Sequence, residues 1–312
     1  MQKNLIITTS PHLRDRATTA SIMRDVCITL LPAGIAGVVF FGQNAVNLIV
    51  LSVLSCVLTE YLWQRLTHRK SKVSDWSAVV TGLLLAYNLP ATAPWWMAVI
   101  GGVIAILLVK QLFGGIGSNF MNPALTARAV LFVSWGGLMG SYPITQFMSD
   151  TASGATPLAI LADNAANVEL WDLFIGNCAG VLGETCKLAL LLGGAYLLVR
   201  RVIDWRIPCC MIGMVFVCFL LKGGFDLALK EILSGALMLG AIFMATDYAT
   251  SPQTNLGKII MGAGCGLLVF VIRAFANYPE GTSFAILFMN VLTPLIDRFT
   301  VPKYFGEVKK NG

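Results

Sequence analysis

The chain has 312 residues, of which 56% are hydrophobic and only 12% are charged, and its formal net charge is +6. A soluble domain carries about 25% charged residues because its surface faces water, so this composition argues against a soluble protein. The basic residues lie in short segments between apolar runs, which is typical of membrane orientation and argues against nucleic-acid binding. Residues 26–59 and 76–109 contain no charged side chain. Since one span needs about 20 apolar residues, the sequence predicts an all-α, polytopic integral membrane protein.

Apolar runs and the breakers between them predict about ten transmembrane helices in a single membrane domain, residues 1–312. The predicted spans are 25–42, 46–64, 76–89, 95–113, 123–138, 171–199, 207–221, 228–246, 258–276 and 283–298. Two sets of five helices would have opposite orientations because five is odd, and weak similarity between the two halves favours such an inverted repeat. The alternative is chance similarity between Gly-rich apolar segments.

The basic residues predict the orientation of these helices. With the N-terminus in the cytoplasm, 16 loop lysines and arginines fall on the cytoplasmic side, against Lys222 alone outside. Cytoplasmic loops carry the excess of Lys and Arg. We therefore expect residues 1–24 and 300–312 to be cytoplasmic and the loop 139–170 to lie outside the cytoplasm.

The loop 139–170 contains a threonine that is suited to modification. Thr156 follows the small residues Ser153, Gly154 and Ala155, and Asp150 lies upstream. Small residues allow another protein to approach the backbone closely. The loop contains no His or Lys that could activate Thr156 as a nucleophile, so we interpret it as an acceptor of a modification. The alternative is a threonine that caps the next helix.

This pattern, Asp-x-x-Ser-Gly-Ala-Thr, resembles the flavinylation signal of the membrane flavoproteins in the Rnf and sodium-pumping NADH:quinone reductase complexes. Five further segments resemble blocks of the same family: 81–90, 114–124, 204–208, 243–252 and 278–281. The resemblance extends over residues 24–300 and is closest to the D subunits of Rnf complexes. The B subunit of the quinone reductase, which is longer at its N-terminus, is an alternative, and a channel or transporter without redox function is a more distant one.

The resemblance implies FMN joined to Thr156 by a phosphoester bond and installed outside the cytoplasm by a flavin transferase. It also implies a second, non-covalent flavin, riboflavin. The complex would couple ferredoxin oxidation and NAD reduction to Na⁺ or H⁺ transport across a bacterial or archaeal cytoplasmic membrane. Its other membrane and peripheral subunits, and the lipid bilayer itself, would be the partners of this chain.

Several polar residues within or beside the apolar runs are candidates for a flavin or ion neighbourhood, because intramembrane charges are costly and usually functional. These candidates are Asn119, Asn122, Arg128, Asp247 and Arg273. For Asn119 and Asn122 the alternative is helix capping. Glu184 and Lys187 are spaced for a structural ion pair on one helical face. The eight cysteines form no Cys-x-x-Cys pair and the two histidines lie in basic polar segments, so no metal site is predicted within this chain.

Overall fold

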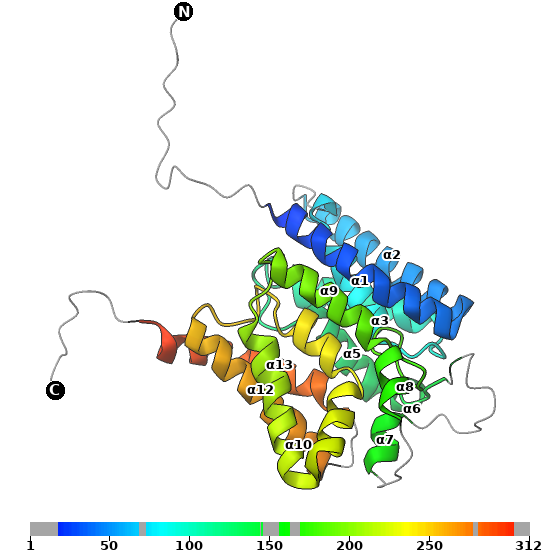
Figure 1. The fold of residues 1–312 in the computed structure, drawn as a ribbon. Coiled ribbons are helices and arrows are strands. Elements are labelled where there is room, and N and C mark those ends of the chain that lie inside the picture. The colour runs from blue at the N-terminus through cyan, green and yellow to red at the C-terminus, as the bar shows by residue number, and fades with distance from the viewer. Residues whose placement is uncertain are drawn as a thin grey trace, which may run out of the picture.

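The computed structural model describes residues 18–68, 73–143, 145, 156–162, 169–276 and 280–302, and within these ranges it contains helices and no β-strand (Figure 1). The first half comprises α1 (Thr19–Phe41), α2 (Gln43–Leu66), η1 (Val73–Asp75), α3 (Ser77–Tyr87), α4 (Trp95–Val103), η2 (Ile104–Gln111), α5 (Pro123–Ser134) and α6 (Gly136–Met139). The second half comprises α7 (Pro157–Ala162), α8 (Leu170–Ile175), α9 (Lys187–Val199), α10 (Arg206–Leu233), α11 (Leu237–Leu239), η3 (Gly240–Met244), α12 (Asn255–Phe275) and α13 (Thr282–Thr300). The predicted all-α class is confirmed.

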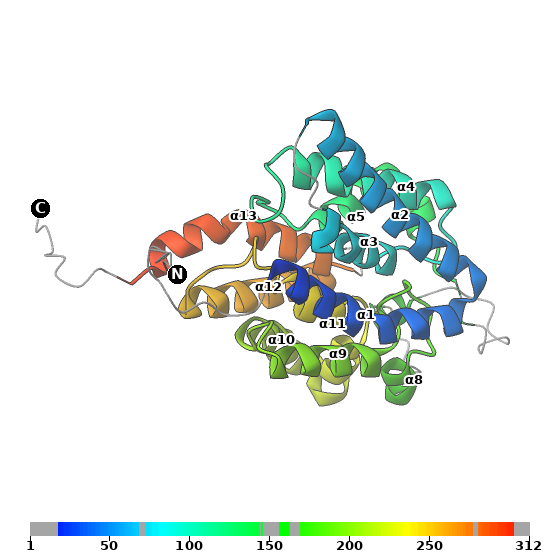
Figure 2. The same cartoon turned by 90° about the horizontal axis from the view of Figure 1, so that it is seen from above.

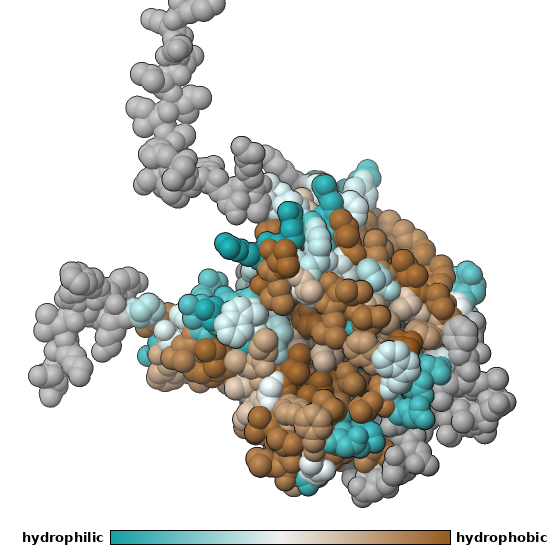
Figure 3. Space-filling view, viewed as in Figure 1, coloured by the Kyte–Doolittle hydropathy of each residue, from teal (hydrophilic) through white to brown (hydrophobic). Residues whose placement is uncertain are grey.

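The helices have the length and surface of a membrane protein. Within the described residues, four helices are long and apolar enough to cross a membrane, namely α1, α2, α10 and α12, and four shorter apolar helices accompany them. Large apolar side chains cover much of the face seen in Figure 3. Across the described residues many are exposed, and Leu31, Val133 and Leu221 have exposed fractions of 52%, 78% and 83%. A continuous apolar surface of this kind requires contact with lipid or another protein. The chain is therefore a multi-pass membrane protein.

Three of the predicted spans are interrupted. The span predicted over 123–138 breaks at Trp135, between α5 and α6. The span predicted over 171–199 is helical only in α8 and α9, and residues 176–186 between them are not helical. The span predicted over 228–246 is broken between α10 and α11. Within α10, Gly224 has a φ of 85°, which a residue with a Cβ rarely adopts, so this helix turns there. Non-helical backbone at membrane depth persists only where protein or a polar cavity surrounds it.

Two helices change to π geometry at comparable places in the two halves. The π-helix η2 continues α4, and the π-helix η3 continues α11. Each is followed by a turn rich in Gly, Asn, Thr or Ser that leads to the next helix. Local π geometry often marks a functional site. The correspondence agrees with an internal repeat, and the inversion of the second half stays a prediction.

The helices form two groups that meet along a central seam (Figure 2). The helices α2, α3, α4 and α5 pack against one another, as do α10, α12 and α13, while α1 packs along α9 between the groups. The short helices α6, α7 and α8 gather at the end of the molecule away from the start of α1 and the end of α13 (Figure 1). The described part of the loop 139–170 therefore lies at the opposite end of the molecule from the start of α1 and the end of α13.

Candidate functional site

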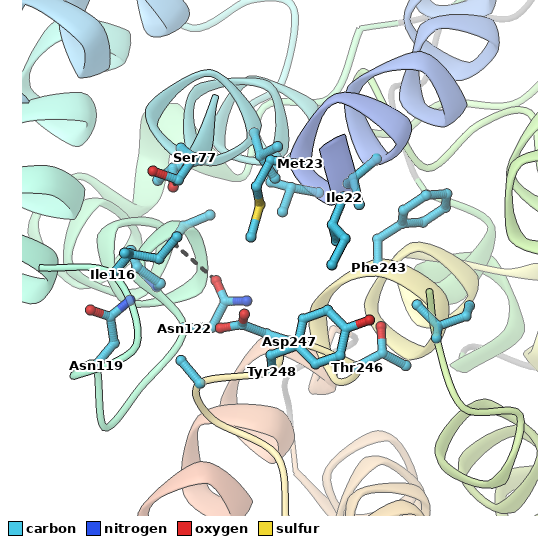
Figure 4. Close-up of a pocket in the computed structure, with 18 of the residues that line it drawn as sticks. Ile22, Met23, Ser77, Ile116, Asn119, Asn122, Phe243, Thr246, Asp247 and Tyr248 are labelled. Atoms are coloured by element: carbon cyan, nitrogen blue, oxygen red, sulfur yellow. Dashed lines mark hydrogen bonds between the residues drawn. The ribbon is translucent and has the colours of Figure 1, made fainter. Parts of the chain in front are cut away.

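A cavity of about 90 Å³ lies between α1, α3 and the two π-helices. Its walls are largely apolar, and polar groups enter it from the turns that follow η2 and η3 (Figure 4). Asn119 and Asn122 come from the first turn, and Asp247 comes from the second. The structure thus brings together three of the residues that the sequence singled out. An apolar cavity with a few convergent polar groups is the usual form of a small-molecule site.

Asn122 holds the two turns together. Its side-chain oxygen accepts hydrogen bonds from the main-chain N–H groups of Ala124 and Leu125, at 3.1 and 3.3 Å, and so caps α5. Pro123 occupies the first position of this helix, where its missing N–H costs nothing. The amide nitrogen of Asn122 donates to the carbonyl oxygen of Met244, at the end of η3. Asn119 is buried, and its Oδ1 has no hydrogen-bond partner among the described groups.

A buried ion pair borders the same cavity. Lys110, on η2, is 2% exposed, and its Nζ lies 2.7 Å from Glu60 Oε2 and 2.6 Å from Ser77 Oγ. The other oxygen of Glu60 accepts from the amides of Gln64 and Gln111, at 3.1 and 2.9 Å. Lys110 and Ser77 both line the cavity. Sequence reasoning missed this pair because each residue stands at the end of an apolar run, where charges are usually solvated.

Arg128 lies in a second buried site. Its guanidinium donates to Asn88 Oδ1 at 3.0 Å and to Ser283 Oγ at 2.7 Å, and it forms an ion pair with Glu280. These partners come from the end of α3, from α13 and from the segment that precedes α13. The structure therefore separates Arg128 from the cavity of Asn119 and Asp247.

Arg273 supports the break between α10 and α11. Its Nη1 contacts Glu231 Oε2 at 3.0 Å and the Glu231 carbonyl at 2.7 Å, and its Nη2 donates to the Ser234 carbonyl. The Lys187 ammonium donates to the next carbonyl, that of Gly235, at 2.9 Å. These cations satisfy carbonyl groups that the broken helix leaves without N–H partners.

The expected pair of Glu184 and Lys187 on one helical face is a wrong prediction. Glu184 precedes α9 and lies in the non-helical connection, and the Lys187 ammonium donates to the main-chain carbonyl of Glu184. The close approach of the connection to α3 explains the break. A Cβ on Gly183 would lie 2.2 Å from the Cβ of Tyr87, so only glycine fits there.

Thr156 lies beside these buried charges. Its side chain is largely buried, and its Oγ1 accepts a hydrogen bond from the main-chain N–H of Ala159 at 3.3 Å, at the start of α7. Thr156 lines a cavity of about 10 Å³ with Glu184 and Glu280. Thr156 therefore caps α7, as the alternative interpretation expected. The same hydroxyl is the predicted acceptor of the modification. The upstream residues Asp150, Ser153, Gly154 and Ala155 lie outside the described residues.

Interrupted helices around two buried, charged sites define a polytopic α-helical membrane protein with ionisable groups in its interior. The chain belongs to the NQR2, RnfD, RnfE family, whose model matches residues 6–306. It is 49% identical over 311 residues to the D subunit of the Na⁺-translocating ferredoxin:NAD⁺ oxidoreductase complex of Acetobacterium woodii, covering 98% of this chain and 96% of that one.

Two further relatives bear related names. The D subunit of the proton-translocating ferredoxin:NAD⁺ oxidoreductase complex of Clostridium ljungdahlii is 38% identical, with 98% of both chains covered. The D subunit of the ion-translocating oxidoreductase complex of Stutzerimonas stutzeri is also 38% identical, with 94% of this chain and 93% of that one covered. The names of the first two relatives differ in the ion, so family membership alone does not select Na⁺ or H⁺.

Proposed function

We propose that this chain is the D subunit of an ion-translocating ferredoxin:NAD⁺ oxidoreductase complex. Similarity over nearly the full length of relatives that bear this name carries the proposal. It favours this complex over the quinone reductase, whose B subunit is the alternative. A channel or transporter without redox function is disfavoured by the same relatives, whose names describe oxidoreductase complexes. The other membrane and peripheral subunits of the complex are then the partners of this chain.

Within this complex, Thr156 carries FMN through a phosphoester bond. Three features support the assignment: the flavinylation pattern, the position of Oγ1 at the start of α7, and the cations that contact other residues of its cavity, namely Arg128 at Glu280 and Lys187 at the Gly235 carbonyl. A phosphodiester carries one negative charge, and N–H groups at a helix start and nearby cations both stabilise anions. Arg128, Lys187 and Arg273 supply positive charge around Glu184 and Glu280, which line the cavity at Thr156.

The residues of this site have a positioning role. When bound, FMN supplies the one-electron chemistry, while the protein sets its place and its electrostatic surroundings. Burial of Thr156, which is 8% exposed, would limit the access of bulk water to the phosphoester. The Ala159 N–H orients the oxygen that bears the phosphoryl group.

The cavity of Asn119, Asn122 and Asp247 suits a second, non-covalent flavin, riboflavin. Its apolar walls match the flat faces of an isoalloxazine ring, and its polar groups match the ring edge. The partnerless oxygen of Asn119 can accept from a ring N–H, and the Lys110 ammonium at the border can donate to a ring carbonyl. The buried orphan acceptor is the observation that supports a ligand here.

We further propose cytoplasmic termini and attachment of FMN outside the cytoplasm by a flavin transferase. The distribution of basic residues supports this orientation, and the position of α7 opposite the start of α1 agrees with it. The test is fluorescence of the denatured protein. Coexpression with a flavin transferase should give a fluorescent band that Thr156→Ala abolishes and Thr156→Ser partly retains. Fluorescence that persists in Thr156→Ala would disprove the attachment site.

A further inference from the structure

Two carboxyl groups meet at Thr156 from segments far apart in the sequence. Glu184 belongs to the connection between α8 and α9, and Glu280 lies two residues before the start of α13. Glu184 and Glu280 are only 5% and 7% exposed. Each carboxyl has one oxygen without a hydrogen-bond partner among the described groups, and both residues line the cavity of about 10 Å³ at Thr156. A cavity of this size holds about one water molecule.

Two acidic side chains that line one small buried cavity favour a shared proton. An ionised carboxylate only accepts hydrogen bonds, so the two carboxyl groups can hydrogen-bond to each other only if one of them is protonated. Glu184 Oε1 already accepts from the Val181 N–H at 3.1 Å, and Glu280 Oε2 is paired with Arg128. Glu184 Oε2 and Glu280 Oε1 have no hydrogen-bond donor among the other described groups. Two like charges this close inside a protein disfavour double ionisation strongly.

The surrounding charges determine the net charge of this cluster with and without a proton on the two glutamates. The cations that act on the pair are Arg128 from α5, Lys187 from α9 and Arg273 from α12, and the further acid is Glu231, paired with Arg273. Among the described residues, Cys178 and Tyr142 are further titratable neighbours of these cations. With all three glutamates ionised, the cluster is neutral. With one proton on the pair, its net charge is +1, which a monoanionic phosphodiester on Thr156 would neutralise.

We propose that Glu184 and Glu280 bind one proton between them, and that binding of this proton is linked to the anionic phosphoryl group on Thr156. The second part rests on the proposed function and the first does not. The proton comes from water and returns to water, and the only bond that forms or breaks is the carboxyl O–H bond. Glu184 is the protonated partner because Glu280 faces the Arg128 guanidinium. Linkage is reciprocal, so the anion on Thr156 increases the affinity of the pair for the proton.

Infrared spectroscopy of the purified full-length chain tests the shared proton. At neutral pH the spectrum should contain the carbonyl stretch of a protonated carboxyl group, with the frequency shift that exchange into D₂O produces. Glu184→Gln should remove this band, because its amide can still donate to Glu280 but cannot hold the proton. Asp172→Asn, which changes a partly exposed acid on α8, should leave the band unchanged. Labelling with ¹³C-glutamate should shift the wild-type band, which identifies a glutamate even if Glu184→Gln fails to fold.

The linkage is tested by comparing flavinylated wild type with Thr156→Ala. The pH at which the band disappears should be lower in Thr156→Ala by about one to three units, the effect of one nearby charge on a carboxyl group. Absence of the band at neutral pH, or its persistence in Glu184→Gln, overturns the shared proton. If the band disappears at the same pH in both proteins, and fluorescence shows that the wild type carries flavin, the linkage is overturned. If the wild-type chain carries no flavin, the proposed function is contradicted instead. The infrared band then still tests whether Glu184 and Glu280 share a proton.

Discussion

The side-chain nitrogen of Asn122 lies 3.3 Å from the carbonyl oxygen of Met244 and donates a hydrogen bond to it. This bond joins the turn after one π-helix to the end of the other. Because the side-chain oxygen of Asn122 also caps α5, one amide fixes both sides of the cavity. Its two functions can be separated by substitution.

Asn122→Asp should retain the cap and lose the bond to Met244, whereas Asn122→Ala should lose both. Loss of an N-cap costs about 0.5–2 kcal/mol, so we expect a lower melting temperature for Asn122→Ala. Both variants should lose non-covalent flavin, measured as flavin released on acid precipitation of the purified complex.

The matched control for these variants is Thr254→Ala, which removes the cap of α12, a helix whose described residues do not line the cavity. It should lower the melting temperature by a similar amount and retain the flavin. Full flavin content in Asn122→Ala would place riboflavin elsewhere.

Lys110 and Glu60 should be strongly coupled in stability. Lys110→Met leaves the Glu60 carboxylate buried without its cation, and removing one partner of a buried pair costs about 3–5 kcal/mol. The double variant Lys110→Met/Glu60→Gln should recover much of the loss because it removes both charges. Thermal unfolding in detergent measures these effects.

The exposed pair of Arg200 and Asp25 provides the comparison. The Arg200 side chain is 57% exposed and its Nη2 lies 3.1 Å from Asp25 Oδ2, so Arg200→Ala should lower the melting temperature much less than Lys110→Met does. Equal losses in Lys110→Met and Arg200→Ala would show that the buried pair has no special energetic role.

The orientation predicts which segments face the outside of the cell. Thr151→Cys, in a chain whose eight native cysteines are replaced, should react with a membrane-impermeant maleimide in intact cells. Thr67→Cys, at the end of α2, should react only after the membrane is permeabilised. The opposite labelling pattern would reverse the topology and the proposed side of flavin attachment.

The surroundings of Asp204, in the loop before α10, predict that the stability of the folded protein depends on pH. Burial alone would raise the pKa of its carboxyl, but the Arg206 N–H and the side chains of Lys258 and Arg206 outweigh this, so the pKa lies below its ordinary value. A depressed pKa stabilises the folded state above the unfolded pKa of about 3.9, and this stabilisation is lost as the pH falls through the folded value.

The melting temperature of wild type should therefore decrease as the pH falls from about 6 to about 3, a range that includes the ordinary carboxyl pKa. Asp204→Asn should be less stable than wild type at the upper end of this range and should lose less on acidification. A constant difference between the two proteins across this range would contradict the role of the ionised carboxylate.

The place of most helices could be predicted from the sequence because charge-free apolar runs of sufficient length have few alternatives, but their division could not, since α10 (Arg206–Leu233) runs from the predicted span 207–221 into the next. The helix α2 (Gln43–Leu66), for example, contains the predicted span 46–64. The break between α8 and α9 could not be predicted, since it depends on the contact of Gly183 with Tyr87, far away in the sequence. The same reason hid the pair of Glu184 and Glu280. Asn122 could be found because it is a polar residue beside an apolar run, but its bond to Met244 could not be predicted, since Met244 is also far away in the sequence.

Asp247 is the candidate whose charge can be separated from its structural role. Its carboxylate lines the cavity and accepts a hydrogen bond from Thr250 Oγ1 at 3.3 Å, and its main-chain oxygen accepts from the N–H groups of Thr250 and Ser251. One view assigns it an electrostatic role, in which its negative charge responds to the charge of a bound flavin and biases two arrangements of the protein. The other view assigns it only the local turn.

Asp247→Asn removes the charge and keeps an oxygen acceptor for Thr250, so the turn should persist. We expect this variant to assemble, to retain covalent FMN and to show slower electron flow or ion transport in reconstituted vesicles. Thr250→Val removes the side-chain hydrogen bond and keeps the charge, so the electrostatic role predicts near-normal transport for it. If Asp247→Asn reduces NAD⁺ and builds the ion gradient at the wild-type rate, or if Thr250→Val is equally impaired, the turn alone explains Asp247.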